Sequence, residues 1–342
     1  MANRCSRRSF LKGLGYATCG GLVHTVGSPL ISPLRAISAE AAQPGKVIVL
    51  VNFRGGFPLN IVPLTHGYWI DRFEELAHPG TALPLADGTA LHPSLTALKQ
   101  IWDEGNLAIA HNCGYYNPAK GVRVNRSHSD STDIFFSGRP DVSTPTEGWA
   151  VRFTNQVAKT YGGVSFGGSN FLVENANFIR NFGDLNNLGE QYFRRGGSSS
   201  TQEEFYRTIR DQLQATTEKG AVNNVGFIRA ANENLDATLE LLKVQTDPQA
   251  NPLPDESLFG NSGFSNQCRD AARIINAPVL DTQFLYVEQG GYDTHSGELA
   301  NLTNRLDDWN EGIGALYENV RQMGRLADVI FVTMADFGRT PF

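Results

Sequence analysis

Runs of apolar and β-branched residues alternate along the chain with segments in which apolar residues recur every three or four positions. Four runs predict buried strands, since central strands of parallel sheets are apolar on both faces. They cover residues 46–51, 107–110, 283–287 and 328–333. Helical periodicity predicts helices over 93–104, 127–136, 147–160, 202–217, 223–245, 264–276 and 298–323. Strands that alternate with helices predict an α/β fold with a mostly parallel sheet and helices on both faces.

The segments that follow the four predicted strands hold most of the unusual polar residues of the chain. They are residues 53–60, 111–128, 288–295 and 335–340. In parallel sheets, ligands bind beyond the carboxyl ends of the strands. The sequence therefore predicts one site, formed where these segments converge.

The segment after the third strand contains Gly290-Gly291 and then Asp293 and His295. A carboxylate and an imidazole two residues apart can both reach a metal cation from one loop. The pattern also suits a tight Gly-Gly turn whose Asp caps the next helix. Asp293 and His295 are therefore candidate metal ligands, with a structural turn as the alternative.

The segment after the fourth strand contains Asp336 and Arg339. Asp336 is a candidate for a second metal carboxylate, and Arg339 is a candidate contact for an anion. A helix cap and a surface charge are the alternatives for these two residues.

The segment before the predicted helix 127–136 contains a second group of candidates. Ser127 and Asp130 have the spacing of a capping pair, which predicts a helix N-cap. Ser127 is alternatively a nucleophile, since backbone N–H groups at a helix N-terminus stabilise a phosphate or sulfate group. Arg126 would add a guanidinium fork for anion oxygens. With the adjacent His128, these residues form the candidate catalytic segment.

Residues 163–167 spell G-x-S-x-G, the pattern of a nucleophile elbow. Such an elbow needs a strand before it and a helix after it. Here a predicted helix precedes the motif and the strand-like residues 171–173 follow it. We therefore predict a structural role for this serine.

The N-terminus predicts export. Residues 6–12 read Ser-Arg-Arg-Ser-Phe-Leu-Lys, which resembles the twin-arginine consensus at every position. The weakly apolar stretch 13–26 is too short and too glycine-rich to span a bilayer. Small residues precede a cleavage site after Ala41, with Ser38 as an alternative. A plain basic tail would not continue into an apolar run, so we expect the twin-arginine translocase as partner and a periplasmic or other extracytoplasmic location.

Removal of the predicted signal peptide, residues 1–41, changes the charge of the chain. The signal takes five of the 29 basic and one of the 35 acidic residues, which leaves a net charge of −10. This charge argues against nucleic acid or an anionic membrane surface as the main partner. No later apolar run is long enough to cross a membrane. Residues 42–342 suffice for a single large α/β domain, with two smaller domains as the alternative.

Several short motifs occur together along the chain. They are the signal, Arg54-Gly55-Gly56 with Leu59-Asn60 and Pro63, Leu91-His92-Pro93, Ile109-Ala110-His111 with Gly114-Tyr115, Asn117-Pro118, Arg126-Ser127-His128 with Asp133 and Ser137-Gly138, Gly148-Trp149, Gly291-Tyr292-Asp293-Thr294-His295, and Val332-Thr333-Met334 with Phe337-Gly338-Arg339. In this combination the chain resembles a large family of twin-arginine-exported bacterial proteins, described only as a domain of unknown function. That family is placed in the alkaline phosphatase and sulfatase superfamily. The resemblance runs from the signal to the last residue and is weak over 161–275.

The resemblance implies an alkaline-phosphatase-like sheet that carries a two-metal site. In that superfamily a Ser or Thr attacks phosphorus or sulfur while two cations hold the attacking and leaving oxygens. Ser127 would match the nucleophile, Asp293 and His295 would supply one metal, and Asp336 would supply the other. The implied function is metal-dependent hydrolysis of small anionic phosphate or sulfate esters, with a divalent metal of unspecified identity as cofactor.

The chain departs from the family pattern at three points. The segment Gly56–Asn60 lacks the Asp that would be a shared metal carboxylate, and Asp336 stands where the family usually has Glu. The sequence ends at Phe342, before a Gly-Thr-Asp-His-Gly segment with the last metal histidine, so we expect a chain that is incomplete at the C-terminus. The alternative function is a non-catalytic periplasmic or envelope protein that keeps the fold for binding or assembly and has lost the metal site.

Overall fold

The fold that the computed structural model describes lies within Gln43–Phe342. The described residues are 45–57, 78, 80–86, 88–110, 113, 127–140, 145–157, 159, 161–167, 172–173, 176, 178–183, 185, 239–295 and 298–338. The predicted signal, residues 1–41, lies outside them. None of the helices in these ranges combines the length and the apolar character that crossing a bilayer requires.

A five-stranded sheet forms the centre of the unit, and every neighbouring pair of its strands is parallel. In spatial order the strands are β5 (Ile179–Asn181), β4 (Gly163–Ser165), β6 (Phe284–Gly290), β1 (Val47–Arg54) and β7 (Val329–Ala335). A separate antiparallel pair joins β2 (Leu83–Pro84) to β3 (Ala90–Leu91). The predicted α/β fold with a parallel sheet is confirmed.

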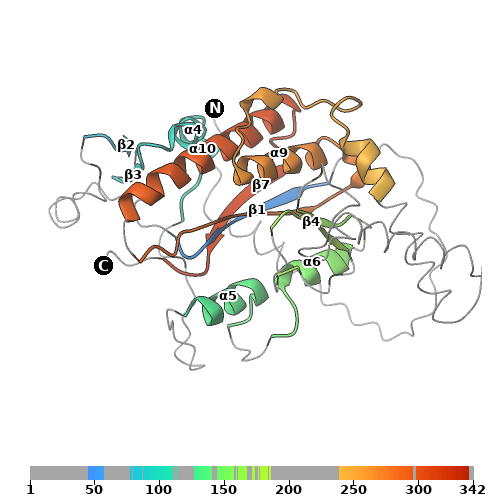
Figure 1. Ribbon diagram of the computed structural model, residues 1–342, viewed down its shortest axis with the longest axis horizontal. Helices are drawn as coiled ribbons and strands as arrows, with labels where there is room; N and C mark the ends of the chain where they lie inside the picture. The colour runs from blue at the N-terminus through green and yellow to red at the C-terminus, as the bar shows by residue number, and fades with distance from the viewer. Residues whose placement is uncertain are drawn as a thin grey trace, which may run out of the picture. The chain divides into compact units, whose positions relative to one another are not determined.

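Helices cover both faces of the sheet (Figure 1). The α-helices are α4 (Thr96–Asp103), α5 (His128–Ser137), α6 (Trp149–Val157), α9 (Gly263–Ile275) and α10 (Glu298–Gln322). The short 3₁₀ helices are η3 (Glu256–Leu258) and η4 (Pro278–Leu280). Figure 1 shows α4, α9 and α10 on one side of the sheet and α5 and α6 on the other.

The alternation of side chains along β1 explains the two layers. Val49 and Val51 belong to the buried cluster that also contains Leu306 of α10. Leu50 lies between them in sequence and belongs to a second cluster with Phe136 of α5. Successive side chains of a strand point to opposite faces, so an unbroken apolar run is buried on both sides, as predicted from the sequence.

One of the four predicted strands is wrong, and so is the expectation that 171–173 is strand-like. Residues 107–110 have no regular secondary structure, and residues 172–173 form a turn. Leu107 and Ile109 instead pack, partly buried, against the core that α9 and α10 share. A short apolar run can therefore be buried without strand pairing, which periodicity alone does not distinguish. The predicted helix 202–217 and most of 223–245 lie outside the described residues, while 239–246 is helical as predicted.

The strands β4 and β5 were not predicted, because each has only three residues and no distinctive apolar pattern. The G-x-S-x-G motif begins in β4, between β5 and β6. Its Ser165 is completely buried, and a Cβ atom at Gly167 would come within 2.3 Å of the ring of Tyr286. The motif is thus a close-packed part of the sheet, which agrees with the predicted structural role.

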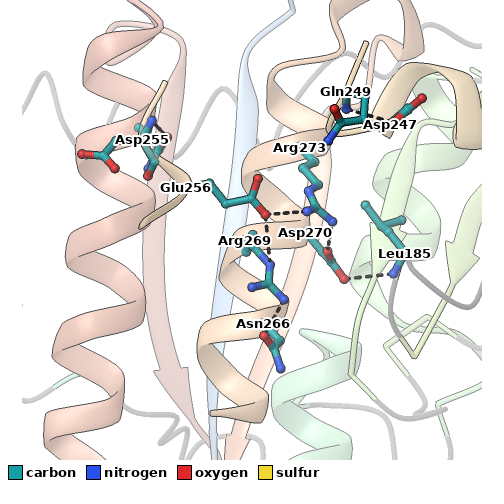
Figure 2. Close-up of polar contacts among 10 residues, drawn as sticks. Leu185, Asp247, Gln249, Asp255, Glu256, Asn266, Arg269, Asp270 and Arg273 are labelled. Atoms are coloured by element: carbon teal, nitrogen blue, oxygen red, sulfur yellow. Dashed lines mark hydrogen bonds and ion pairs between the residues drawn. The ribbon is translucent and has the colours of Figure 1, made fainter. Parts of the chain in front are cut away.

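A buried charged network joins α9 to two neighbouring segments (Figure 2). Arg273 donates to Glu256 of η3 at 2.6 Å and pairs with Asp270 at 3.5 Å. Asp270 also accepts a hydrogen bond of 2.9 Å from the backbone N–H of Leu185, which follows β5. Both charged groups of the α9 pair are buried, so each depends on its partners for the hydrogen bonds that water would otherwise supply.

We expect Asp270→Ala to lower the free energy of unfolding by about 3 kcal/mol, because it leaves the buried Arg273 with one carboxylate fewer and removes the acceptor for Leu185. Chemical denaturation followed by circular dichroism measures the change. Glu318→Ala, which breaks an exposed ion pair with Arg321 on α10, should cost much less because solvent screens that pair. Equal losses in the two variants would show that the network does not stabilise the fold.

Candidate functional site

The carboxyl ends of β1, β6 and β7 converge at one edge of the sheet. β1 lies between the other two strands, with Arg54 opposite Gly290 and Phe53 opposite Ala335. The contacts continue past the strands, since the N–H of Tyr292 donates to the carbonyl of Arg54 at 3.3 Å. Phe57 forms a parallel bridge with Gly338. Three of the four predicted strand exits therefore meet as expected.

Two glycines with positive φ shape the turn that carries Asp293. Gly55 has φ of +111° and Gly291 has φ of +92°, values that glycine adopts without a Cβ penalty. A Cβ atom at Gly55 would lie 2.3 Å from the backbone nitrogen of Asp293. The Gly55 position thus lets the loop after β1 pack directly against Asp293.

Ser127 is the N-cap of α5, as predicted from its spacing to Asp130. The Ser127 Oγ accepts a hydrogen bond of 3.3 Å from the N–H of Asp130. His128 is the first residue of the helix, and its ring lies 4.5 Å from that of Phe337, centroid to centroid. The capping role does not exclude the predicted nucleophile, because the hydroxyl oxygen remains at the positive end of the helix dipole.

The imidazole of His128 contacts two carboxylates, one from each of two strand exits. Its Nδ1 lies 2.5 Å from Oδ2 of Asp336, and its Nε2 lies 3.1 Å from Oδ1 of Asp293. The Asp336 side chain is only 7% exposed, while those of His128 and Asp293 are 36% and 40% exposed. Because both ring nitrogens face acceptor oxygens, the doubly protonated imidazolium satisfies both contacts.

These contacts determine the direction of the pKa shift of His128. Partial burial lowers the pKa, but the hydrogen bonds and charges of Asp336, and then those of Asp293, raise it by more. The net pKa of His128 lies above the ordinary value of 6.5. The positive end of the α5 dipole disfavours a protonated ring at His128. The two carboxylates raise the pKa nevertheless.

His295 lies on the solvent side of Asp293. Its Nε2 is 3.2 Å from Oδ1 of Asp293, and its side chain is 84% exposed. The structure therefore brings together Asp293, His295, Asp336 and His128, with Ser127 next to His128 in the chain. The candidate anion contacts Arg126 and Arg339 lie outside the described residues.

The donor types at the site suit a divalent cation, since carboxylate oxygens and imidazole nitrogens are common metal ligands. Within the part of the chain that the structure describes, however, no group of three or more His, Cys, Asp or Glu side chains is arranged to hold a metal ion. A cation shared by Asp293 and Asp336 would have to displace the ring of His128 from between them. Metal ligation by Asp293, His295 and Asp336 therefore stays a prediction.

Two residues that support the site had no predicted role there. Arg305 of α10 donates to the carbonyl of Gly290 at 2.7 Å and covers Gly291, where a Cβ atom would meet the guanidinium. Tyr292 is buried and its ring packs edge to face against Phe53. The position of Arg305 in its helix does not distinguish it from an ordinary surface residue, so only its tertiary contacts assign it to the turn before Asp293.

We expect protonated His128 to stabilise the folded protein. Because the pKa is raised on folding, this contribution is complete below the unfolded pKa of about 6.5 and is lost as the pH rises through the higher folded pKa. The difference in unfolding free energy between the wild type and His128→Gln should therefore shrink as the pH increases from about 6 to about 9.

Nuclear magnetic resonance titration of the His128 ring measures the pKa directly. Asp336→Asn should move the pKa back toward the ordinary value, because the main raising contacts come from Asp336. A His128 pKa at or below 6.5 in the wild type would contradict the bridging arrangement.

The chain has relatives at the family level. No curated protein matches it, and no solved structure does. A protein family described as "Protein of unknown function (DUF1501)" matches residues 71–342, which is more than half of the chain. The chain therefore belongs to the DUF1501 family of proteins of unknown function.

Proposed function

We propose that this protein is an exported hydrolase of phosphate or sulfate esters that uses Ser127 as nucleophile. The observation that carries the proposal is the convergence of Asp293, Asp336 and His128 beside a serine at a helix N-terminus. The location agrees with the rule that ligands of parallel α/β sheets bind beyond the carboxyl ends of the strands. The alkaline-phosphatase-like relationship remains part of this proposal.

Each residue has a chemical role in the proposed reaction. The Ser127 oxygen forms a bond to phosphorus or sulfur, the serine proton passes to the neutral ring of the adjacent His128, and the ester bond to the alcohol breaks. His128, as an imidazolium, protonates the departing alcohol. Water then attacks phosphorus or sulfur, His128 takes the water proton and passes it to the Ser127 oxygen, and the bond from that oxygen to phosphorus or sulfur breaks to release the inorganic anion. The backbone N–H groups at the start of α5 stabilise the negative oxygens.

Asp293, His295 and Asp336 are the proposed ligands of a divalent cation. Such a cation would supply Lewis-acid stabilisation of the ester oxygens when bound. The exposed imidazole of His295 and the half-exposed Asp293 are accessible from solvent, whereas Asp336 must first exchange its contact with His128.

The competing function is that of an exported protein that binds a partner without catalysis. It is favoured by the His128 contacts, because one imidazolium already neutralises much of the charge that two carboxylates would offer to a cation.

We expect the purified mature protein to hydrolyse an aryl phosphate or an aryl sulfate, with divalent metal detected by mass spectrometry. Ser127→Ala should lower kcat by about 10³-fold, since it removes the attacking oxygen. Ser129→Ala is the matched control, because Ser129 lies in the same helix and is exposed. Unchanged turnover in Ser127→Ala would remove this residue from the mechanism, and a metal-free, inactive wild type would favour the binding function.

We also propose that residues 1–41 direct the chain to the twin-arginine translocase. Replacing both Arg7 and Arg8 by Lys should leave the precursor in the cytoplasm, because the pathway reads the arginine pair. Cell fractionation and immunoblotting measure the distribution. Arg4→Lys, outside the pair, should leave export unchanged, and normal export of the double variant would show that another route is used.

A further inference from the structure

Arg54 is a cation at the site that none of the predicted roles uses. It is the last residue of the central strand β1, and its carbonyl accepts the N–H of Tyr292 in the turn that leads to Asp293. The next residue, Gly55, packs against Asp293 itself. The side chain of Arg54 therefore leaves the sheet at the edge where the candidate catalytic residues converge.

The guanidinium of Arg54 is held loosely. Its Nη1 lies 3.6 Å from Oε1 of Glu288, which is beyond hydrogen-bonding distance, and the side chain is 71% exposed. The Nε and Nη2 atoms face Gly290, where an added Cβ atom would lie 3.4 and 3.3 Å from them. The absence of a side chain at Gly290 gives the guanidinium room to lie over this end of β6.

Glu288 is fixed more firmly than its partner. Its Oε2 accepts a hydrogen bond of 2.8 Å from the hydroxyl of Tyr286, which in turn accepts one of 2.9 Å from Asn52. The N–H of Glu288 donates to Gln267 at 2.9 Å. Tyr286 and Asn52 are buried, so their hydrogen bonds hold the Glu288 carboxylate in place. This carboxylate attracts the Arg54 guanidinium but forms no hydrogen bond that would occupy its N–H groups.

The charge at the site suggests what the guanidinium of Arg54 binds. In the absence of a bound metal cation, two carboxylates and one imidazolium carry a net negative charge, which repels an anionic ester. The other arginine at this turn, Arg305, already donates to the carbonyl of Gly290. A planar guanidinium binds two oxygens of a tetrahedral anion at once, and the long contact with Glu288 leaves N–H donors of Arg54 for this purpose.

We propose that Arg54 binds the non-reacting oxygens of a tetrahedral oxyanion, the phosphate or sulfate group of the substrate. The inference rests on the proposed hydrolase function, because it assigns the anion contact of the same site. Arg54 is then a specificity-determining residue that favours charged esters over neutral ones.

Isothermal titration of the mature protein with inorganic phosphate, and separately with sulfate, tests this inference without requiring turnover. Arg54→Gln should weaken binding by about ten- to a hundredfold, the range expected for hydrogen bonds to a charged group. Arg54→Lys keeps the charge without the fork, so it should recover part of the affinity and provides a second variant if the first fails to fold. Whichever anion binds more tightly to the wild type identifies the ester class.

Arg321→Gln is the matched control, since Arg321 is an exposed arginine on α10 that pairs with Glu318. Its affinity should equal that of the wild type. Binding by Arg54→Gln within twofold of the wild type, or no binding of either anion by the wild type at millimolar concentration, would overturn the inference.

The outcomes separate this inference from the proposed function. Arg54-dependent anion binding with no ester hydrolysis would leave the anion site standing and reject the hydrolase. Hydrolysis with an unchanged KM in Arg54→Gln would support the hydrolase and reject the role of Arg54.

Discussion

The parallel pairing of β1 with both β6 and β7 is the constraint on which the rest of the site depends. Parallel neighbours end at the same edge of a sheet, so the loops that carry Asp293 and Asp336 meet although 42 positions separate them in the sequence. The pairing in turn requires β1 to be buried on both faces, which its apolar run allows. Gly55 allows the loop after β1 to lie directly against Asp293, since only a residue without a side chain fits at this contact.

Electrostatics decides what this edge can bind. The imidazole of His128 lies between two carboxylates, and their combined hydrogen bonds outweigh the cost of burying its charge. The same carboxylates are the proposed ligands of a cation, so protonated His128 and a metal compete for the same oxygens. In the catalytic proposal a metal binds the oxygens of Asp293 and Asp336, whereas in the non-catalytic proposal protonated His128 keeps them. In the proposed hydrolase, the loosely paired Arg54 would add positive charge for binding the anionic substrate.

Long elements were predictable from the sequence, and short ones were not. The runs in β1, β6 and β7 and the periodicity of α9 and α10 are strong enough to override local ambiguity. Residues 107–110 have the composition of a strand, but Leu107 and Ile109 are partly buried without strand pairing. Burial of apolar side chains requires no particular backbone geometry, whereas a strand requires hydrogen bonds to a neighbouring strand. Conversely, β4 becomes a strand between β5 and β6 although three residues give no usable periodicity.

The sequence by itself determined the α/β class, the N-cap at Ser127 and the polar residues that follow the strands, because these depend on local spacing and on burial on two faces. Only the tertiary structure decided that His128 contacts both Asp293 and Asp336, and that Arg54 keeps its donors accessible while Arg305 does not. The reason is physical. A pattern of residues fixes the face or end on which a side chain lies, but a contact a few ångströms long depends on the relative positions of elements that are distant in the chain, and packing sets those positions.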